Sequence, residues 1–525
     1  MELRRASRGG ALVAALAVVA TSATLLWPVL SVEIPPLSDL PNHMAVLHIL
    51  STIDSDPFLQ RNYDVSWSLQ PNLGLHLISI PLASWLDAFQ IGRVLVALAL
   101  LLPLLGSFLL HRVLYGRFGL WPLAAGLFVF NQCLALGFIN YLLGAGLAIF
   151  GVALWLHLSE RPAAVRIVVG TGLGLLLYIT HLMAFLAYGL IVVLEAAGAG
   201  WQERKAAQRH IVERLTFAIV PLLPAIAITL SIRVDFAGDL LLFGGMRAKM
   251  MALVSPTLFH AEILDFVVLV LVLCGIVWGL ASRRIVVHPR LRLPLLGLLV
   301  AAMLMPHYAR GMYALDWRLP FLILCLFFAA SEPRFGAAAT RLAWAGAIAV
   351  LLISRSVAMT DEWRRYDAYF AEFREATASM DRGARLLVAE STPADVSDLA
   401  IRRYAVIHLA ALSVIDSSAF LPTLFTFATP LRASASTLRL DAHGGEPQRL
   451  EELWQASSAA GRASLAGAPR YWHDWTQDFD YLVHLHFGGD SRDLQGLPVE
   501  MLRTGSFFDV MRITSRAANS APTRR

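Results

Sequence analysis

Long apolar runs fill most of the first two thirds of the chain and are almost absent from the last third. An α-helix needs about 20 mostly apolar residues to cross roughly 30 Å of hydrocarbon. Residues 356–525 have instead the mixed polarity of a soluble protein. The pattern predicts an α-helical polytopic membrane domain over 1–355 and a soluble domain over 356–525. About 11 transmembrane helices are expected, at 11–30, 91–110, 119–136, 141–158, 165–180, 182–199, 215–231, 263–281, 293–306, 317–331 and 339–355.

Composition supports lipid as the solvent of the first domain. Hydrophobic residues make up 57% of the chain and charged residues 15%, whereas soluble domains carry about 25% charged residues. The net charge of +5 does not indicate a nucleic-acid partner, because Lys and Arg stand in short loops between apolar runs and not on one basic face. All three cysteines lie inside apolar runs, so we expect no disulfides in the soluble domain.

The distribution of basic residues predicts the orientation in the membrane. Alternate loops, starting from the N-terminus, hold 17 Lys and Arg residues, whereas the loops between them hold at most five. Lys and Arg are retained on the cytoplasmic side of a membrane. We therefore expect the N-terminus in the cytoplasm, and the loop 31–90 and the domain 356–525 on the outer side.

Two segments allow more than one interpretation. The apolar stretch 165–199 is long enough for two spans, and we place the break near His181. Residues 1–30 read as an uncleaved span or as a cleaved signal peptide, because a basic pair precedes an apolar stretch that contains small residues. The run continues to Leu30, longer than the apolar region of a typical signal peptide, which favours the span.

The centres of the predicted spans carry no Asp, Glu, Lys or Arg, and Glu195 comes closest, near a cytoplasmic end. Ionisable side chains at mid-membrane mark ion and proton pathways. The pattern therefore argues against an ion-coupled transporter and directs the search for functional residues to the outer loops.

The first outer loop, 31–90, opens with a polar stretch that predicts a helix start. Ser38 or Asp39 followed by Pro41 is a typical beginning of a helix. A helix from this point places Asp39 and His43 on one face, one turn apart. Asp39 then has two interpretations. It is either the cap of the helix, or a carboxylate at the membrane surface that acts as a base or metal ligand with His43 beside it.

A second polar cluster lies between the ninth and tenth predicted spans and contains His307, Arg310, Asp316 and Arg318. Two arginines on the side that is otherwise poor in basic residues require an anionic partner. Lipid headgroups, Asp316 and a substrate phosphate are the candidates, and the planar guanidinium contacts phosphate bidentately. Two further outer residues are expected to be satisfied interhelical hydrogen-bonding groups: Asn140 and His181.

The soluble domain has the pattern of a small α/β domain. Strand-like runs lie at 384–390, 481–487 and 507–513, and helical patterns lie at 397–413 and 448–460. The aromatic run 471–475 is interpreted as core packing in preference to a saccharide contact.

The layout and two short motifs resemble the GT-C superfamily of polytopic membrane glycosyltransferases. Ser38-Asp39-Leu40-Pro41-Asn42-His43 stands in the first outer loop, where that family carries its catalytic acidic residue. Phe138-Ile139-Asn140-Tyr141-Leu142-Leu143-Gly144 is similar to a short outer turn of bacterial relatives. The architectural match covers essentially the whole chain. It implies a bacterial inner-membrane protein with a periplasmic C-terminal domain and Asp39 as the catalytic residue. Leu40 departs from the Asp-Glu pair of the aminoarabinose and mannosyl transferase branches, which leaves the donor sugar and metal use open.

The resemblance implies a polyprenyl-phosphate-linked sugar as donor, membrane lipids as surroundings, and a glycan, lipid or protein as acceptor. Asp39 is expected to orient or deprotonate the acceptor hydroxyl. Four residues are expected to bind substrate, with the arginines stabilising the departing phosphate: His43, His307, Arg310 and Arg318. If a divalent metal takes part, Asp39 and His43 are its candidate ligands. We expect Asp39 and the two arginines to face one cavity.

Two other functions stay open at the level of the sequence. A lipid or saccharide flippase would show a continuous polar path through the helices and a repeated half, and neither pattern is visible. A noncatalytic membrane scaffold would present the soluble domain as a binding module.

Overall fold

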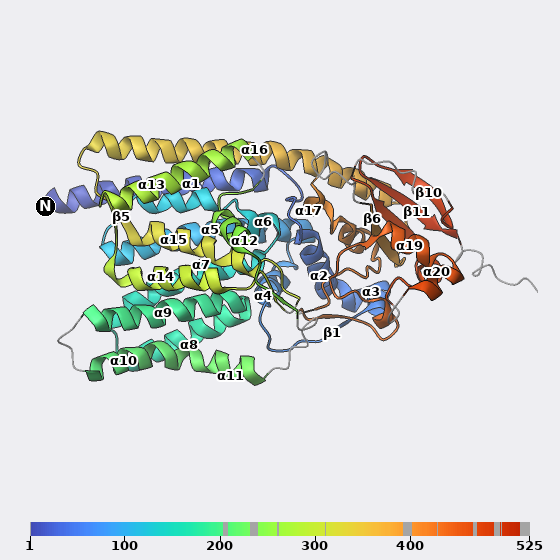
Figure 1. Cartoon of the computed structure of the whole chain (residues 1–525), viewed down its shortest axis with the longest axis horizontal. Coiled ribbons are helices and arrows are strands. Elements are labelled where there is room, and N and C mark those ends of the chain that lie inside the picture. The colour runs from blue at the N-terminus through green and yellow to red at the C-terminus, as the bar shows by residue number, and fades with distance from the viewer. Residues whose placement is uncertain are drawn as a thin grey trace, which may run out of the picture. The chain divides into compact units, whose positions relative to one another are not determined.

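The computed structural model describes residues 2–202, 208–231, 240–259, 262–309, 311–391, 402–427, 429–465, 470–487, 494 and 496–514 (Figure 1). The chain divides into two compact units. The helical unit comprises Met1–Ser31, Leu69–Leu75 and Val94–Glu362. The mixed unit comprises Val32–Ser68, His76–Arg93 and Trp363–Arg525. Most of the first outer loop therefore packs with C-terminal residues, although the sequence analysis grouped that loop with the membrane helices.

The helical unit is built from long helices and short connecting strands. Its α-helices are α1 (Glu2–Leu30), α5 (Ala88–Tyr115), α6 (Gln132–Ala135), α7 (Ile139–His157), α8 (Ala163–Thr180), α9 (Leu182–Gln202), α10 (Gln208–Ile219), α11 (Leu223–Ser231), α12 (Met246–Val254), α13 (Glu262–Ala281), α14 (Pro289–Leu304), α15 (Leu315–Ala330) and α16 (Ala338–Thr377). Its 3₁₀ helices are η2 (Trp121–Phe128), η3 (Leu158–Glu160) and η4 (Val220–Leu222). Two antiparallel strand pairs complete it: β2 (Leu241–Leu242) with β4 (Tyr308–Ala309), and β3 (Ile285–Val287) with β5 (Ser331–Pro333).

Eight of the predicted spans coincide with helices that are long and apolar enough to cross a membrane, counted over the described residues. The predicted break near His181 is confirmed, because α8 ends at Thr180, His181 is extended, and α9 begins at Leu182. α16 is a single helix of 40 residues, or about 60 Å at 1.5 Å per residue. The division between the two units falls inside this helix.

Three predicted spans differ from the structure. The range 119–136 is not one helix, because η2 is followed by Asn131, whose extended backbone and side-chain bond to the Leu134 N–H start the separate helix α6. The helices α14 and α15, in the predicted ranges 293–306 and 317–331, each have 16 residues. Such helices are about 24 Å long and are shorter than the hydrocarbon they were expected to cross.

Close helix contacts and one buried ion pair hold the helical unit together. A Cβ added at Gly146 in α7 would lie 2.5 Å from the Cβ of Leu102 in α5, so the small residue permits the close approach typical of membrane helices. Arg355 in α16 pairs with Asp265 in α13 at 3.2 Å, and both side chains are buried. Arg355 also donates to the carbonyl of Phe130.

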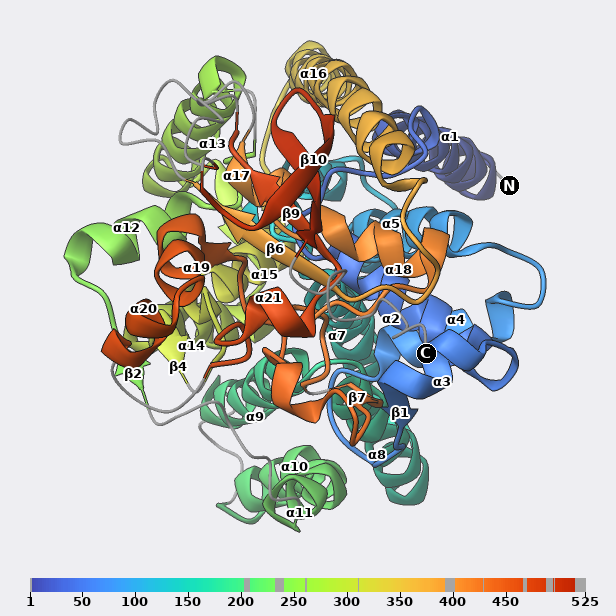
Figure 2. The same cartoon turned by 90° about the vertical axis from the view of Figure 1, so that its right-hand side faces the viewer.

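The mixed unit contains a five-stranded mixed sheet in the order β10-β11-β9-β6-β8. Strands β6 (Leu386–Glu390), β8 (Gln448–Arg449) and β9 (Tyr481–Leu485) are parallel. Beyond β9, β11 (Phe508–Ile513) pairs antiparallel with β9, and β10 (Val499–Thr504) pairs antiparallel with β11. Figure 2 shows β6 and β9 crossing the unit side by side. A separate antiparallel pair joins β1 (Tyr63–Val65) to β7 (Leu431–Ala433). The helices are α2 (Leu40–Thr52), α3 (Pro57–Asn62), α4 (Gly74–Leu82), α17 (Arg403–Val406), α18 (Leu412–Ser417), α19 (Leu450–Ala456), α20 (Ala459–Ser464) and α21 (Trp475–Asp478), with 3₁₀ helices η1 (Ile53–Ser55), η6 (Leu409–Ala411) and η7 (Leu438–Leu440).

The predicted α/β character of the C-terminal residues is confirmed, with strands β6, β9 and β11 in the three predicted strand ranges. The predicted helix 397–413 is replaced by the short helices α17, η6 and α18, and residues 392–401 lie outside the described residues. Trp472 and Trp475 are almost completely buried, and the Trp475 indole donates to the Leu453 carbonyl. The aromatic run is therefore core, as the favoured interpretation held.

Candidate functional site

Asp39 immediately precedes α2, as the sequence predicts, but it does not cap the helix. Its backbone is already helical, its side chain makes no capping hydrogen bond, and Pro41 occupies the first turn. The carboxylate Oδ1 instead lies 3.7 Å from Nε2 of His408, and 22% of the Asp39 side chain is exposed. The capping interpretation is therefore wrong, and the carboxylate lies beside His408.

Two histidines with lowered pKa values lie close to this carboxylate. His43 is one turn along α2, and its ring contacts Phe425 edge-on at 5.2 Å, while His408 contacts the same ring at 5.6 Å. Burial, helped by His76 and His408, lowers the pKa of His43 to about 3. Burial lowers the pKa of His408 to about 4; Glu446 opposes this shift and Arg403 adds to it. Both imidazoles are therefore neutral at neutral pH.

Acid is expected to destabilise the mixed unit through His408. Its pKa is about 4 in the folded protein and ~6.5 in an unfolded chain, so between these values the folded state binds fewer protons. This stability is complete above the unfolded pKa and is lost as the pH falls toward the folded pKa, by about 2 kcal/mol at pH 5. Thermal unfolding of the purified protein at several pH values measures the loss. His408→Gln should remove about half of the loss at pH 5, because His43, whose pKa is lowered to about 3, contributes a similar loss. His443→Gln, at a side chain that is 61% exposed, should leave the profile unchanged. Equal profiles for wild type and His408→Gln would refute the assignment.

The second predicted cluster is organised around Asp316, which is completely buried in the first turn of α15. Its carboxylate pairs with Lys249 Nζ and with His307 Nδ1, each at 2.8 Å. Lys249 also donates to the Met305 carbonyl. The predicted Asp316–Arg318 pair is therefore wrong, because Lys249 and His307 occupy the carboxylate. The turn that brings His307 to Asp316 has positive φ at Gly311, where glycine is favoured.

Arg318 is largely buried, with 7% of its surface exposed. Its guanidinium carbon lies 4.6 Å from the Phe138 ring centre and 5.9 Å from that of Tyr141. One terminal nitrogen lies 3.4 Å from Nε2 of His181. Two residues of the Phe138–Gly144 motif, Phe138 and Tyr141, therefore contact Arg318 through their aromatic rings and hold its guanidinium in place. Arg310 lies outside the described residues.

Asn140, another residue of that motif, is satisfied as predicted. Its side chain accepts from the Leu75 N–H and donates to the Asn72 carbonyl, at 3.0 and 3.1 Å. It ties the start of α7 to the segment before α4 and has a structural role.

Asp39 and His43 belong to the mixed unit, and His307 and Arg318 to the helical unit. The expectation that Asp39 and the arginines face one cavity stays a prediction. Within the part of the chain that the structure describes, no group of three or more His, Cys, Asp or Glu side chains has the geometry of a metal site. Asp39 and His43 alone do not complete such a site.

Sequence reasoning missed His408 and Lys249. Each is flanked by apolar residues, in Ile407-His408-Leu409 and in Ala248-Lys249-Met250. An unexplained His or Lys in such a stretch is the only local signal, since its partner is distant in the sequence.

The eight helices of spanning length and the C-terminal sheet define a polytopic α-helical membrane protein with an α/β unit. No family model and no curated protein matches the chain. Among solved structures, it is similar to ArnT from Cupriavidus metallidurans, crystallised with undecaprenyl phosphate. The identity is 10% and the TM-score 0.48, over 97% of this chain and 99% of that chain.

Proposed function

We propose that this chain is a GT-C-type membrane glycosyltransferase that moves a sugar from a polyprenyl-phosphate donor to an acceptor on the outer face of a bacterial inner membrane. The observation that supports it most is the state of Asp39. It is a partly exposed carboxylate at the predicted catalytic position, not used as a cap, with the neutral His408 beside it. A carboxylate in this state can accept a proton.

In the proposed reaction, Asp39 takes the proton of the acceptor hydroxyl, and the hydroxyl oxygen attacks the anomeric carbon of the donor sugar. The bond between that carbon and the phosphate oxygen breaks, and polyprenyl phosphate leaves with the bonding electrons. Arg318 stabilises the charge that develops on the phosphate. His43 and His307 contact the substrate through their imidazole nitrogens. His43 is neutral, and His307 is oriented by its contact with Asp316. The resemblance implies inversion at the anomeric carbon, in agreement with this single displacement.

The role of Arg318 can be tested by Arg318→Lys. The variant keeps the positive charge but loses the planar fork that contacts phosphate through two hydrogen bonds. We expect sugar transfer in membranes to fall about 10- to 100-fold, the equivalent of one charge-assisted hydrogen bond. Arg382→Lys, at an exposed arginine of the mixed unit, is the control and should transfer normally. Wild-type transfer by a folded Arg318→Lys variant would contradict this role.

The proposed outer location of the mixed unit can be tested by cysteine labelling in intact cells. In a Cys274→Ala background, whose other cysteines are buried, Ser464→Cys should react with a membrane-impermeant thiol reagent. Ser282→Cys, in a loop predicted to be cytoplasmic, should react only after permeabilisation. Both serines are exposed. Labelling with the opposite sidedness would overturn the orientation and, with it, the choice of a lipid-linked donor.

A further inference from the structure

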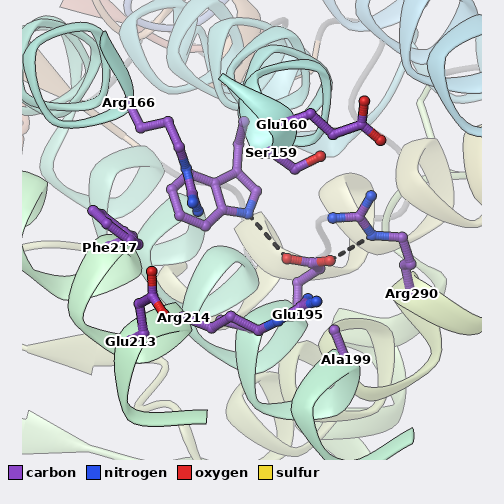
Figure 3. Close-up of a pocket in the computed structure, with 11 residues that line it drawn as sticks. Ser159, Glu160, Arg166, Glu195, Ala199, Glu213, Arg214, Phe217 and Arg290 are labelled. Carbon is purple, nitrogen blue, oxygen red and sulfur yellow. Dashed lines mark hydrogen bonds and ion pairs between the residues drawn. The ribbon is translucent and has the colours of Figure 1, made fainter. Parts of the chain in front are cut away.

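A polar cavity of about 540 Å³ lies within the helical unit, away from every residue assigned above (Figure 3). Its walls come from the end of α7 with η3, the first turn of α8, the late part of α9, the middle and later part of α10 and the first turn of α14. These helix ends adjoin the loops 159–166, 200–214 and 282–292, which are rich in Lys and Arg. The cavity therefore opens on the side predicted to be cytoplasmic.

The floor of the cavity is a fixed network around Glu195. One carboxylate oxygen accepts from the Trp155 indole at 3.0 Å, and the other accepts from Arg290 Nε at 2.6 Å. The Glu195 side chain is buried, whereas that of Arg290 is 31% exposed. Figure 3 shows the Arg290 guanidinium beside this carboxylate. The network uses both oxygens of Glu195 and fixes Arg290 at the wall.

Arg166 is held by aromatic rings. Its guanidinium carbon lies 4.4 Å from the centre of Phe217 and 5.3 Å from that of Trp155. Its Nε is buried and has no hydrogen-bond partner among the described residues. Cation–π contact fixes the position of a guanidinium without neutralising its charge, so Arg166 brings a fixed positive charge to the cavity that it lines.

The rim carries the opposite charge, and the adjoining surface is apolar. Glu160 and Glu213 line the cavity and are exposed. Trp155 and Arg166 also border a smaller hollow whose other walls are apolar or aromatic, among them Leu154, Leu158, Leu173 and Tyr188. The site thus combines a small apolar hollow, a group of arginines and a rim of exposed carboxylates.

We infer that this cavity binds the headgroup of a phospholipid that carries a phosphate and a primary amine. The phosphate contacts Arg166, with Arg214 and Arg290 beside it, because guanidinium groups bind phosphate by charge-assisted hydrogen bonds. The amine reaches Glu160 and Glu213 at the rim. An acyl chain lies along exposed apolar side chains of α7 and α8, such as Leu154 and Val168, because the hollow itself, at about 10 Å³, is too small for it. Basic pockets between membrane helices on the cytoplasmic side are a known setting for headgroups. This inference does not rest on the proposed glycosyl transfer.

Native mass spectrometry of the full-length protein tests the inference. The protein is equilibrated with equal amounts of phosphatidylethanolamine, phosphatidylglycerol and phosphatidylcholine that have identical acyl chains. We expect preferential retention of phosphatidylethanolamine, and a loss of about tenfold in Arg166→Gln, the equivalent of one charge-assisted hydrogen bond. Arg112→Gln is the matched control, because Arg112 also stacks on a ring, that of Phe118 at 5.2 Å, but does not line the cavity. Its retention should equal that of wild type.

Further experiments test the contact with the amine and the contact with the acyl chain separately. The double variant Glu160→Gln/Glu213→Gln should lose the preference for phosphatidylethanolamine over phosphatidylglycerol. Soluble phosphoethanolamine should not displace the lipid, since it lacks the acyl chain; displacement would show that the site takes a soluble phosphate compound. If Arg166→Gln does not fold, Arg214→Gln replaces it. Equal retention of the three lipids by wild type, or unchanged retention in the folded arginine variant, would overturn the inference.

Discussion

Replacing Asp39 with Asn is expected to lower the rate of sugar transfer by a factor of about 10²–10⁴, the usual contribution of a positioned general base. Asn has nearly the same size and removes only the charge and the proton acceptor. Because the Asp39 side chain makes no capping hydrogen bond, the variant should keep the stability of wild type. Transfer of labelled sugar in membranes and thermal unfolding of the purified variant measure the two effects.

Asp56 provides a matched control in the same unit, because it is a true helix cap. Its carboxylate accepts from the N–H groups of Phe58 and Leu59 at the start of α3. Asp56→Ala should cost about 1 kcal/mol of stability, as lost caps do, and should leave transfer at the wild-type rate. Full activity in Asp39→Asn would remove Asp39 from the mechanism. A stability loss in Asp39→Ala like that of Asp56→Ala would restore the capping interpretation, since Asn caps a helix as well as Asp does.

Replacing Asp316 with Leu is expected to have the largest effect on stability, because it leaves the Lys249 ammonium buried without its carboxylate. The two side chains are 0% and 8% exposed, and removing one partner of such a pair costs about 3–5 kcal/mol. The double variant Asp316→Leu/Lys249→Met should recover most of the loss, since an apolar pair of similar volume often replaces a buried ion pair at little cost. Thermal unfolding in detergent provides the double-mutant cycle.

The exposed pair Arg117–Glu332, at 2.8 Å with the Arg117 side chain 69% exposed, is the control for this cycle. Its disruption should cost at most about 1 kcal/mol, as for other surface ion pairs. A double variant as unstable as Asp316→Leu alone would show that the carboxylate stabilises the protein through His307 and not through Lys249.

Local sequence patterns predicted most of the helices and strands, but not which distant side chains pair with one another. The break between α8 and α9 at His181 and the strands β6, β9 and β11 follow from apolar runs and turn residues, which are properties of neighbouring positions. The range 119–136 is mostly apolar, yet it forms η2 and α6, because Asn131 in an extended conformation begins a new helix.

The candidate site could be predicted only in part. The sequence placed Asp39 and His43 on one helix face, because four residues make about one turn. It could not supply His408, which comes from a distant segment of the mixed unit. It also paired Asp316 with its neighbour Arg318, whereas the structure pairs Asp316 with Lys249 in α12 and turns Arg318 toward Phe138 and Tyr141. These choices depend on tertiary packing, which sequence periodicity does not contain.

The most direct test of the proposed function is to follow both products of the displacement at once. Purified protein in lipid nanodiscs is given a labelled polyprenyl-phosphate sugar and a mixture of envelope acceptors, and free polyprenyl phosphate and labelled acceptor are measured together. The proposed transferase releases one polyprenyl phosphate for each sugar transferred, and the Asp39→Asn protein releases neither above background. If wild type yields neither product, while the same protein in sealed vesicles carries the intact donor across the bilayer, the chain is a flippase and the proposed transferase function is wrong.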